Sequence, residues 1–167
     1  KEILEKKIKI NYLGIGSNLG NKKKNIEKAK FKLSENNIKI LQSSNYYESV
    51  SWPNPNNPKF LNIVVEISTS LRPLELLGLC KQIEKNLGRK KSIRNSPRIC
   101  DIDILDYNKK CLNKDIILPH PRMHSRNFVL LPLFEINKDW FHPLLKKHIK
   151  RLILLLSNRD ITSIKQI

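Results

Sequence analysis

The stretch Ile99-Cys-Asp-Ile-Asp-Ile-Leu105 alternates apolar and acidic side chains and predicts a strand with two different faces. Successive side chains of a strand point to opposite faces, so Cys100, Ile102 and Ile104 share one face. Asp101 and Asp103 share the other face, with Cα atoms about 6–7 Å apart. A basic segment, Arg89 to Pro97, leads into this strand. We therefore expect a carboxylate pair beside a positively charged loop.

Five segments before this strand show helical or strand periodicity. The expected order is a strand at 8–15, a helix at 21–35, strands at 38–48 and 60–69, a helix at 73–87 and the strand at 99–105. This β-α-β-β-α-β order predicts an α+β fold, a ferredoxin-like antiparallel sheet with both helices on one face. The acidic pair would then lie on the opposite, uncovered face. Residues 111–136 are expected to form an arm, and residues 144–156 an amphipathic helix that covers part of the core.

The length of 167 residues suits one domain with a single core. We expect this domain at residues 8–167, preceded by a charged extension at residues 1–7. An irregular loop is predicted between the second and third strands, because the segment 51–58 contains three prolines.

The chain carries 32 Lys and Arg against 15 Asp and Glu, a formal net charge of +17. Most of the excess is lysine in scattered runs such as Lys22–Lys24, which is typical of solvated surface. The arginines are concentrated instead, at positions 89, 94, 98, 122 and 126. Because a guanidinium binds phosphate oxygens in a planar, bidentate way, we expect an anion site there.

The three cysteines, Cys80, Cys100 and Cys111, lack the C-x-x-C spacing and lie in or beside apolar segments. Structural thiols of a reducing compartment are expected, in preference to disulfides or a zinc site. No apolar run reaches the roughly 18 residues of a membrane span, and the first residues are charged unlike a signal peptide. We therefore expect a soluble, cytoplasmic protein.

The pair Asp101 and Asp103 is a candidate Mg²⁺ site. Mg²⁺ is commonly held by a few carboxylates together with phosphate oxygens and water. The alternative is a solvent-exposed strand with two salt-bridged aspartates. The surrounding arginines and lysines favour the metal, because phosphotransfer requires metal ions and cationic clamps. A Walker A pattern is absent from the sequence, so a P-loop does not supply the phosphate cradle.

Three further residues, His120, Phe60 and Phe128, are considered beside the acidic pair. His120 lies between Pro119 and Pro121, and it either donates to a phosphate or stabilises a turn. The aromatic residues Phe60 and Phe128 are core residues by periodicity alone.

Several motifs together resemble one enzyme family, 6-hydroxymethyl-7,8-dihydropterin pyrophosphokinase, from about Ile8 to at least Ile136. The matching segments are Leu13-Gly-Ile-Gly-Ser-Asn-Leu19, Phe60-Leu-Asn62, Pro97-Arg-Ile-Cys-Asp-Ile-Asp-Ile-Leu105, Leu118-Pro-His-Pro-Arg-Met123 and Arg126-x-Phe128-Val-Leu-x-Pro-Leu. The resemblance implies transfer of pyrophosphate from ATP to the pterin hydroxymethyl group, with AMP leaving. It also implies the ferredoxin-like fold expected above.

The resemblance implies a role for each matching position. Asp101 and Asp103 would hold two Mg²⁺ ions that bridge ATP and pterin. The pterin would lie between Phe60 and Phe128, which reverses their assignment to the core, and Asn62 would bind its polar edge. The pterin site would comprise Gly16, Ser49, Phe60, Asn62, Asp101 and Phe128. The ATP site would comprise Glu84, Arg89, Lys91, Arg98, Ile104, His120 and Arg126. The catalytic set would be Asp101, Asp103, Arg89, Lys91 and Arg98.

The chain departs from the family pattern in the basic loop. The family has Arg-Trp-Gly-Pro-Arg where this chain has Arg94-Asn-Ser-Pro-Arg98, so Asn95 replaces a tryptophan that helps to close the site. Lys91 stands where an arginine is usual. Trp52, in the proline-rich loop, is a candidate for the missing aromatic cover. We expect weaker closure of the loop and an unchanged reaction.

The expected partners are ATP and the pterin, with no nucleic acid and no membrane. A monomer is expected, with fusion to or association with another folate enzyme as a further expectation. Two other functions fit a basic sheet protein: an RNA-binding ferredoxin-like module and a metal-dependent nuclease. The strands carry no RNP-like pattern, and the two aspartates would repel a phosphate backbone unless metal were bound.

Overall fold

The computed structural model describes residues 9–167; the expected extension at 1–7, together with Ile8, lies outside the described residues. The order of the elements is β1 (Ile10–Ser17), α1 (Lys22–Glu35), β2 (Lys39–Ser43), β3 (Tyr47–Ser49), β4 (Phe60–Ser68), α2 (Pro73–Asn86), β5 (Asp101–Tyr107), β6 (Leu112–Lys114), β7 (Ile116–Leu118), the 3-10 turn η1 (Met123–Ser125), α3 (Asn127–Ile136), α4 (Ile149–Leu154), α5 (Asn158–Thr162) and β8 (Lys165–Gln166).

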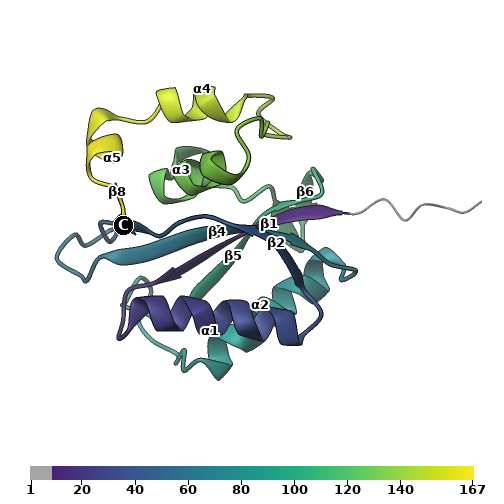
Figure 1. Cartoon of the computed structure of the whole chain (residues 1–167), viewed down its shortest axis with the longest axis vertical. Helices are drawn as coiled ribbons and strands as arrows, with labels where there is room; N and C mark the ends of the chain where they lie inside the picture. Colours follow the sequence, from purple (N-terminus) through teal and green to yellow (C-terminus); the bar gives the residue numbers. More distant parts are fainter. Residues whose placement is uncertain (1–8) are drawn as a thin grey trace, which may run out of the picture.

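The main sheet is antiparallel, and helices lie on both of its faces (Figure 1). Its strand order is β5-β1-β4-β3-β8, and β2 also pairs with β4. In the register of β1 and β5, Gly14 lies opposite Asp103 and Gly16 opposite Asp101. On its other side, Gly16 lies opposite Asn62 of β4. The acidic strand β5 therefore lies at one edge of the sheet, beside the glycine-containing strand β1.

Helices α1 and α2 cover one face of the sheet, as expected (Figure 1). Asn21 caps α1 by accepting a hydrogen bond from the backbone N–H of Lys24. Pro73 occupies the first turn of α2, where a missing N–H costs nothing. The buried stripes of the two helices are Ile26, Ala29 and Leu33 in α1 and Leu76, Cys80 and Ile83 in α2. Full burial of each such aliphatic side chain stabilises the fold by about 1.5–3 kcal/mol.

The expectation that the opposite face of the sheet is uncovered is wrong. Helices α3 and α4 lie over the opposite face and form a second core there (Figure 1). The reason is that Tyr12, Val64 and Leu105 point to that face and are fully or nearly buried, and such apolar surface needs cover. The aspartates of β5 lie on this same face, next to the start of α3, where Arg126 contacts Asp103.

Three element boundaries differ from the sequence expectation. The strand expected at 38–48 is two strands, because the pairing with β4 shifts register and breaks at Ser44. The arm expected at 111–136 contains a hairpin, β6 and β7, and helix α3, which continues through Pro132. The helix expected at 144–156 spans only Ile149–Leu154.

Two other expectations concern the cysteine thiols and membrane-spanning helices. All three cysteines are free; Cys80 and Cys100 are buried, whereas Cys111 is exposed. Burial raises the pKa of the Cys80 and Cys100 thiols to about 12, so both stay protonated at neutral pH. Within residues 9–167, no helix has the length and apolar character needed to cross a membrane.

Candidate active site

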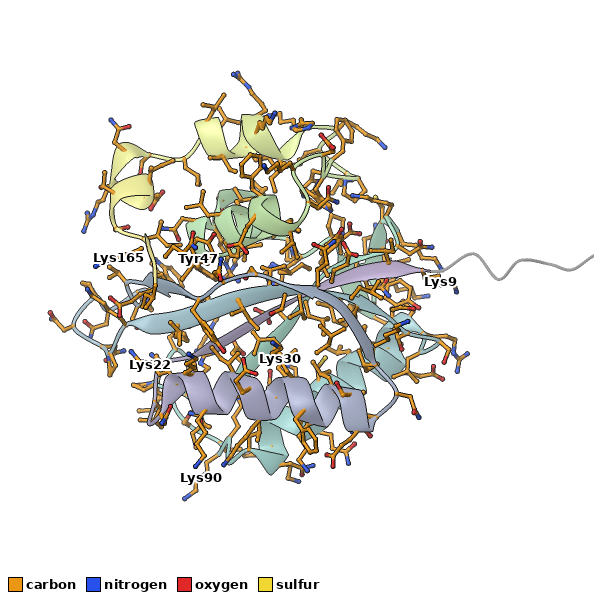
Figure 2. The ribbon with its side chains drawn as sticks, viewed as in Figure 1. Lys9, Lys22, Lys30, Tyr47, Lys90 and Lys165 are labelled. Carbon is orange, nitrogen blue, oxygen red and sulfur yellow. The ribbon has the colours of Figure 1, made fainter. Side chains whose placement is uncertain are left out.

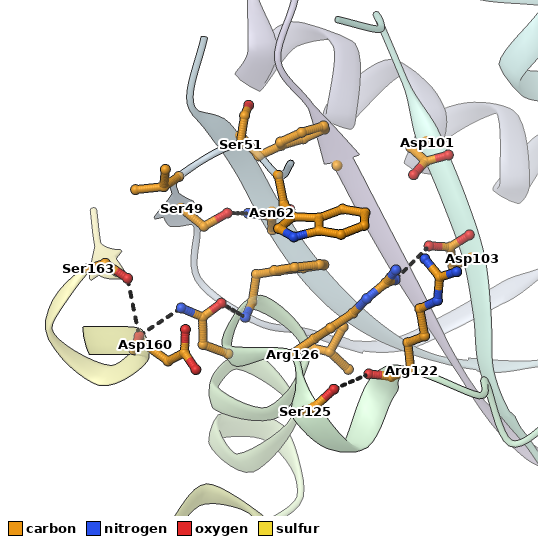
Figure 3. A pocket seen from close by; sticks show the side chains of 18 of the residues that line it. Ser49, Ser51, Asn62, Asp101, Asp103, Arg122, Ser125, Arg126, Asp160 and Ser163 are labelled. Carbon is orange, nitrogen blue, oxygen red and sulfur yellow. Dashed lines mark hydrogen bonds and ion pairs between the residues drawn. The ribbon is translucent and has the colours of Figure 1, made fainter. Parts of the chain in front are cut away.

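A cleft of about 700 Å³ opens where the sheet, the proline-rich loop and the C-terminal segments meet. Figure 3 shows Asp101 and Asp103 on one side of it and Asp160 and Ser163 on the other. The full lining is Gly14, Ile15, Gly16, Ser49, Val50, Ser51, Trp52, Pro53, Pro55, Phe60, Asn62, Ile63, Asn95, Arg98, Asp101, Asp103, Leu105, Arg122, Ser125, Arg126, Asn127, Phe128, Val129, Arg159, Asp160 and Ser163.

The floor of the cleft requires a glycine at position 16. A Cβ added to Gly16 would lie 3.0 Å from Oδ1 of Asn62 and 3.5 Å from the ring of Phe60. Both neighbours belong to the expected pterin site, so a side chain at position 16 would displace the residues that face the ligand. The glycine therefore leaves backbone as the floor between Asn62 and the acidic strand.

The acidic pair lies among three arginines. Asp101 contacts Arg89, with Nη1 to Oδ1 at 2.9 Å, and Arg98, with Nη1 to Oδ2 at 3.4 Å. Asp103 has a longer contact, 3.8 Å from Oδ2 to Nη1 of Arg126 (Figure 3). Asp103 is therefore the less compensated of the two carboxylates.

Burial, together with the negative charge of Asp101, raises the pKa of Asp103 to about 6, while Arg126 opposes the shift. Two carboxylates that repel each other at the floor of a cleft are suited to a divalent cation, which would relieve the repulsion. Their oxygen atoms are the hard donors that Mg²⁺ prefers. Within the described residues, no third acidic, histidine or cysteine side chain completes a metal cluster, so remaining ligands would come from substrate and water. The residues present fit a Mg²⁺ ion shared with a phosphate ligand.

Glu84 lies behind the acidic strand rather than in the cleft. Its side chain is 2% exposed, and Oε1 accepts a hydrogen bond from the backbone N–H of Ile102 at 2.8 Å. Oε2 accepts from Arg89 at 2.6 Å. Glu84 thus fixes β5 and the Arg89 guanidinium together, and its influence on the cleft passes through Arg89.

The other end of the cleft is aromatic. Phe60 and Phe128 are both half-buried and line it, and the Arg126 guanidinium lies 5.3 Å from the centre of the Phe128 ring. The Asn62 amide is oriented by two hydrogen bonds that its Nδ2 donates, to Ser49 Oγ at 2.9 Å and to the Tyr47 carbonyl at 3.2 Å. This orientation turns Oδ1 towards Gly16 and the cleft.

Besides Glu84, four residues of the expected ATP site lie outside the cleft lining. Arg89 contacts Asp101, which lines the cleft, and Lys91 is exposed on the basic loop. The Ile104 side chain is buried in the core beneath the helices, so only its backbone faces β1. His120 accepts a hydrogen bond at Nδ1 from Arg122 N–H, and burial together with Arg126 and Arg122 lowers its pKa to about 4. Its imidazole is therefore neutral at pH 7.

Sequence patterns missed part of the lining. Ser125 and Asn127 lie between recognised motif positions, whereas Arg159, Asp160 and Ser163 come from a short C-terminal helix with no motif of its own. Trp52 and Asn95 both line the cleft, and the Trp52 side chain is largely exposed at its mouth. The tryptophan of the proline-rich loop and the asparagine of the basic loop therefore face the same cavity.

The cleft thus joins an acidic and arginine-rich end, suited to a metal-bound phosphate ligand, to an aromatic end suited to a flat ring. This combination is typical of an enzyme that transfers a phosphate-containing group to a ring-bearing substrate. The family described as 7,8-dihydro-6-hydroxymethylpterin-pyrophosphokinase (HPPK) matches residues 12–138. The chain belongs to this family.

Similar proteins agree with the family match. The chain is 41% identical over 140 residues to the 2-amino-4-hydroxy-6-hydroxymethyldihydropteridine pyrophosphokinase of Aquifex aeolicus, which covers 83% of this chain and 87% of that protein. It is 45% identical over 133 residues to the folic acid synthesis protein fol1 of Pneumocystis carinii, covering 79% of this chain. The chain spans about a fifth of the length of that protein and of its Dictyostelium discoideum counterpart.

A solved structure of Plasmodium falciparum HPPK-DHPS A437G with pteroate has the same fold, with a TM-score of 0.74 at 18% identity. The match covers 100% of this chain and 48% of that one.

Proposed function

We propose that this chain transfers pyrophosphate from ATP to the hydroxymethyl group of 6-hydroxymethyl-7,8-dihydropterin and releases AMP, a step of folate biosynthesis. The observation that carries the proposal is the single cleft in which Asp101 and Asp103 lie among arginines beside a slot lined by Phe60 and Phe128. Membership of the HPPK family and similarity to two bacterial pyrophosphokinases support it.

Each end of the cleft has its part in the proposed reaction. Phe60 and Phe128 would stack on the pterin, while Asn62 and Ser49 bind its polar edge. Arg98 and Arg126, with Arg89 and Lys91 from the basic loop, would bind the ATP phosphates and neutralise charge that develops during transfer. The hydroxymethyl oxygen attacks the β-phosphorus in line, and AMP leaves without a covalent enzyme intermediate.

Two Mg²⁺ ions held by Asp101 and Asp103 would supply charge neutralisation between the ATP phosphates and the attacking oxygen. The raised pKa of Asp103 supports this role, because a carboxylate that is unstable as an isolated anion gains most from a cation. His120 is neutral at pH 7 and would act as a hydrogen-bond donor through Nε2, since Nδ1 already accepts from Arg122.

We also propose the topology of the core, the cellular compartment and the state of association. The strand order β5-β1-β4-β2, with α1 and α2 on one face, supports a ferredoxin-like core in residues 8–167. We infer a cytoplasmic enzyme, which suits three free cysteines. A fused or associated second folate enzyme is in keeping with the relatives named bifunctional, and the domain itself is proposed to be a monomer.

The test is AMP release from ATP. We expect AMP only when Mg²⁺, ATP and hydroxymethyl-dihydropterin are all present. Asp103→Asn should lower turnover by at least about 100-fold, because one metal ligand is lost while the shape of the side chain is kept. The control is Asp139→Asn, which removes a carboxylate that is 96% exposed and distant from the cleft.

Two outcomes would contradict the proposal. AMP release without pterin would indicate ATP hydrolysis, and cleavage or tight binding of RNA at physiological salt would favour the nuclease or the RNA-binding module. Near-normal turnover of Asp103→Asn in Mg²⁺ would contradict the metal assignment alone.

A further inference from the structure

The last residues of the chain form one wall of the cleft. Arg159, Asp160 and Ser163 line it, although they lie beyond residue 138, where the family match ends. This segment is attached to the sheet, because β8 pairs with β3 and the N–H of Ile167 donates to the Tyr46 carbonyl at 2.9 Å. Figure 1 shows this end of the chain returning to the edge of the sheet next to β3.

In the first turn of α3, which carries Phe128, the N–H groups of Val129 and Leu130 donate to the Arg126 carbonyl. Arg126 is the N-cap residue and makes no side-chain capping bond. Pro132 lies four residues after Phe128 inside the helix, and it has no N–H to donate to the Phe128 carbonyl. The helix ladder is therefore interrupted at the residue whose ring lines the cleft.

The Asn127 side chain supplies two hydrogen bonds at this interrupted turn. Its Oδ1 accepts a hydrogen bond from the Phe128 N–H at 2.7 Å, which caps the helix locally. Its Nδ2 donates to the backbone carbonyl of Asp160 at 2.7 Å, across 33 residues of sequence. One amide thus joins the first turn of α3 to the C-terminal wall, as the dashed contacts beside Asp160 in Figure 3 show.

The far end of α3 is held by other elements. Glu135 accepts hydrogen bonds from the Tyr47 hydroxyl at 2.7 Å and from the Asn45 N–H at 2.8 Å. Tyr47 lies between α3 and the sheet in Figure 2. The C-terminal half of α3 is therefore fixed to β3, and the position of the first turn depends on Asn127 and the segment it contacts.

We propose that Asn127 is a positioning residue and that the C-terminal segment, residues 157–167, sets the placement of the Phe128 ring and so the affinity for the pterin. The inference rests on the proposed function, because it takes the ring-bearing ligand to be the pterin. ATP binds at the arginine-rich end, so loss of this support affects the pterin far more than ATP.

Asn127→Asp tests the contact directly. The aspartate keeps an oxygen that accepts from the Phe128 N–H but replaces the amide donor with a second acceptor facing the Asp160 carbonyl. We expect the KM for the pterin to rise about tenfold, with the KM for ATP and kcat changed less than about threefold. Thr162→Val is the matched control, because it changes an exposed side chain of α5 that bonds only within its own helix.

A second variant changes the α5 side of the same contact. Ser157→Ala removes the cap that Ser157 Oγ provides to the Asp160 N–H at 3.1 Å. We expect about a threefold rise in the pterin KM alone and little further rise when this change is added to Asn127→Asp, because both act through the Asp160 backbone.

Equal rises in both KM values, a loss of thermal stability with unchanged pterin KM, or fully additive effects in the double variant would each overturn the inference. Pterin-dependent AMP release by the unchanged chain is measured alongside. If that release is present and the variants fail to separate the two substrates, the positioning role is wrong and the proposed function stands; if it is absent, both are wrong.

Discussion

Nη1 of Arg89 donates to Oδ1 of Asp101 at 2.9 Å, and the same nitrogen also contacts buried Glu84. An oxygen that the proposed Mg²⁺ ion would use is therefore already bonded to a guanidinium. Metal and arginine compete for one acceptor, and the phosphates of ATP offer Arg89 an alternative partner. We infer that Arg89 transfers from Asp101 to phosphate when Mg-ATP binds.

Arg89→Ala should separate these two roles. Affinity for Mn²⁺ without nucleotide is expected to increase by about threefold to tenfold, because Asp101 no longer has a competing cation nearby. Turnover should fall by about 100-fold, since a phosphate-binding group is lost. Calorimetry with Mn²⁺ and the AMP assay measure the two effects, and Arg72→Ala, an exposed arginine paired with Glu75, is the control. Weaker Mn²⁺ binding by Arg89→Ala would contradict the competition.

Phe128→Ala should weaken pterin binding by about 10-fold to 100-fold and leave ATP binding within about twofold. The pterin loses the stacking partner on one face, and aromatic contacts contribute both area and preferred geometry. Calorimetry with each ligand separately is the measurement. Phe31→Ala, which removes an exposed ring on α1, should change neither affinity. Equal losses for the two ligands would indicate that Phe128 is only a core residue.

The basic loop, residues 89–97, should be protected when both substrates bind. It joins α2 to β5, carries Arg89, Lys91 and Arg94, and exposes its one large apolar side chain, Ile93, to 86%. With little buried surface to hold it, the loop is expected to open readily in the free enzyme and to close over the phosphates.

Hydrogen exchange of the loop amides, with and without a non-hydrolysable ATP analogue plus pterin, measures this closure. We expect slower exchange in the complex at residues 89–96 and unchanged exchange in α1, none of whose residues lines the cleft. If the loop exchanges equally fast in both states, it is not a lid.

His142 should make the protein less stable in acid. The side chain is buried, and its Nδ1 accepts backbone N–H bonds from Leu145 at 3.0 Å and Leu144 at 3.2 Å. Burial, with the neighbouring His124 and Lys109, lowers the pKa of His142 from 6.5 to about 4, although Asp106 opposes the shift. Protonation would remove the acceptor from both backbone bonds.

The direction in which stability changes with pH follows from the lowered pKa of His142. Above pH 6.5 neither the folded nor the unfolded state binds the proton, and the full stability is present. As pH falls from 6.5 to 4, the unfolded state binds a proton that the folded state excludes, so the free energy of unfolding decreases by about 2–3 kcal/mol.

Asn at position 142 can accept the same backbone bonds without titrating, so His142→Asn should reduce this acid sensitivity. Urea unfolding at pH 7 and pH 4.5 compares the two proteins. His120, whose pKa is also lowered, is present in both and cancels in the comparison. An identical loss of stability in both proteins would show that His142 does not titrate as described.

Local chemistry in the sequence determined the elements and the acidic pair. Strict alternation from Ile99 to Leu105 placed the carboxylates on one face of a strand, and this holds in β5, because side-chain alternation depends on the backbone alone. The helices expected at 21–35 and 73–87 begin where Asn21 caps α1 and Pro73 opens α2, since capping depends on neighbouring residues. The ligand roles given to the site residues remain predictions.

Tertiary structure alone decided what covers the second face of the sheet and what closes the cleft. Pro132 argues against a helix in the sequence, yet α3 persists because packing on Tyr12, Val64 and Leu105 outweighs the lost hydrogen bond. The contact between Asn127 and the Asp160 carbonyl joins residues 33 positions apart. A backbone carbonyl has no sequence signal, so a site wall built from main-chain contacts between distant segments is determined only when the whole chain has folded.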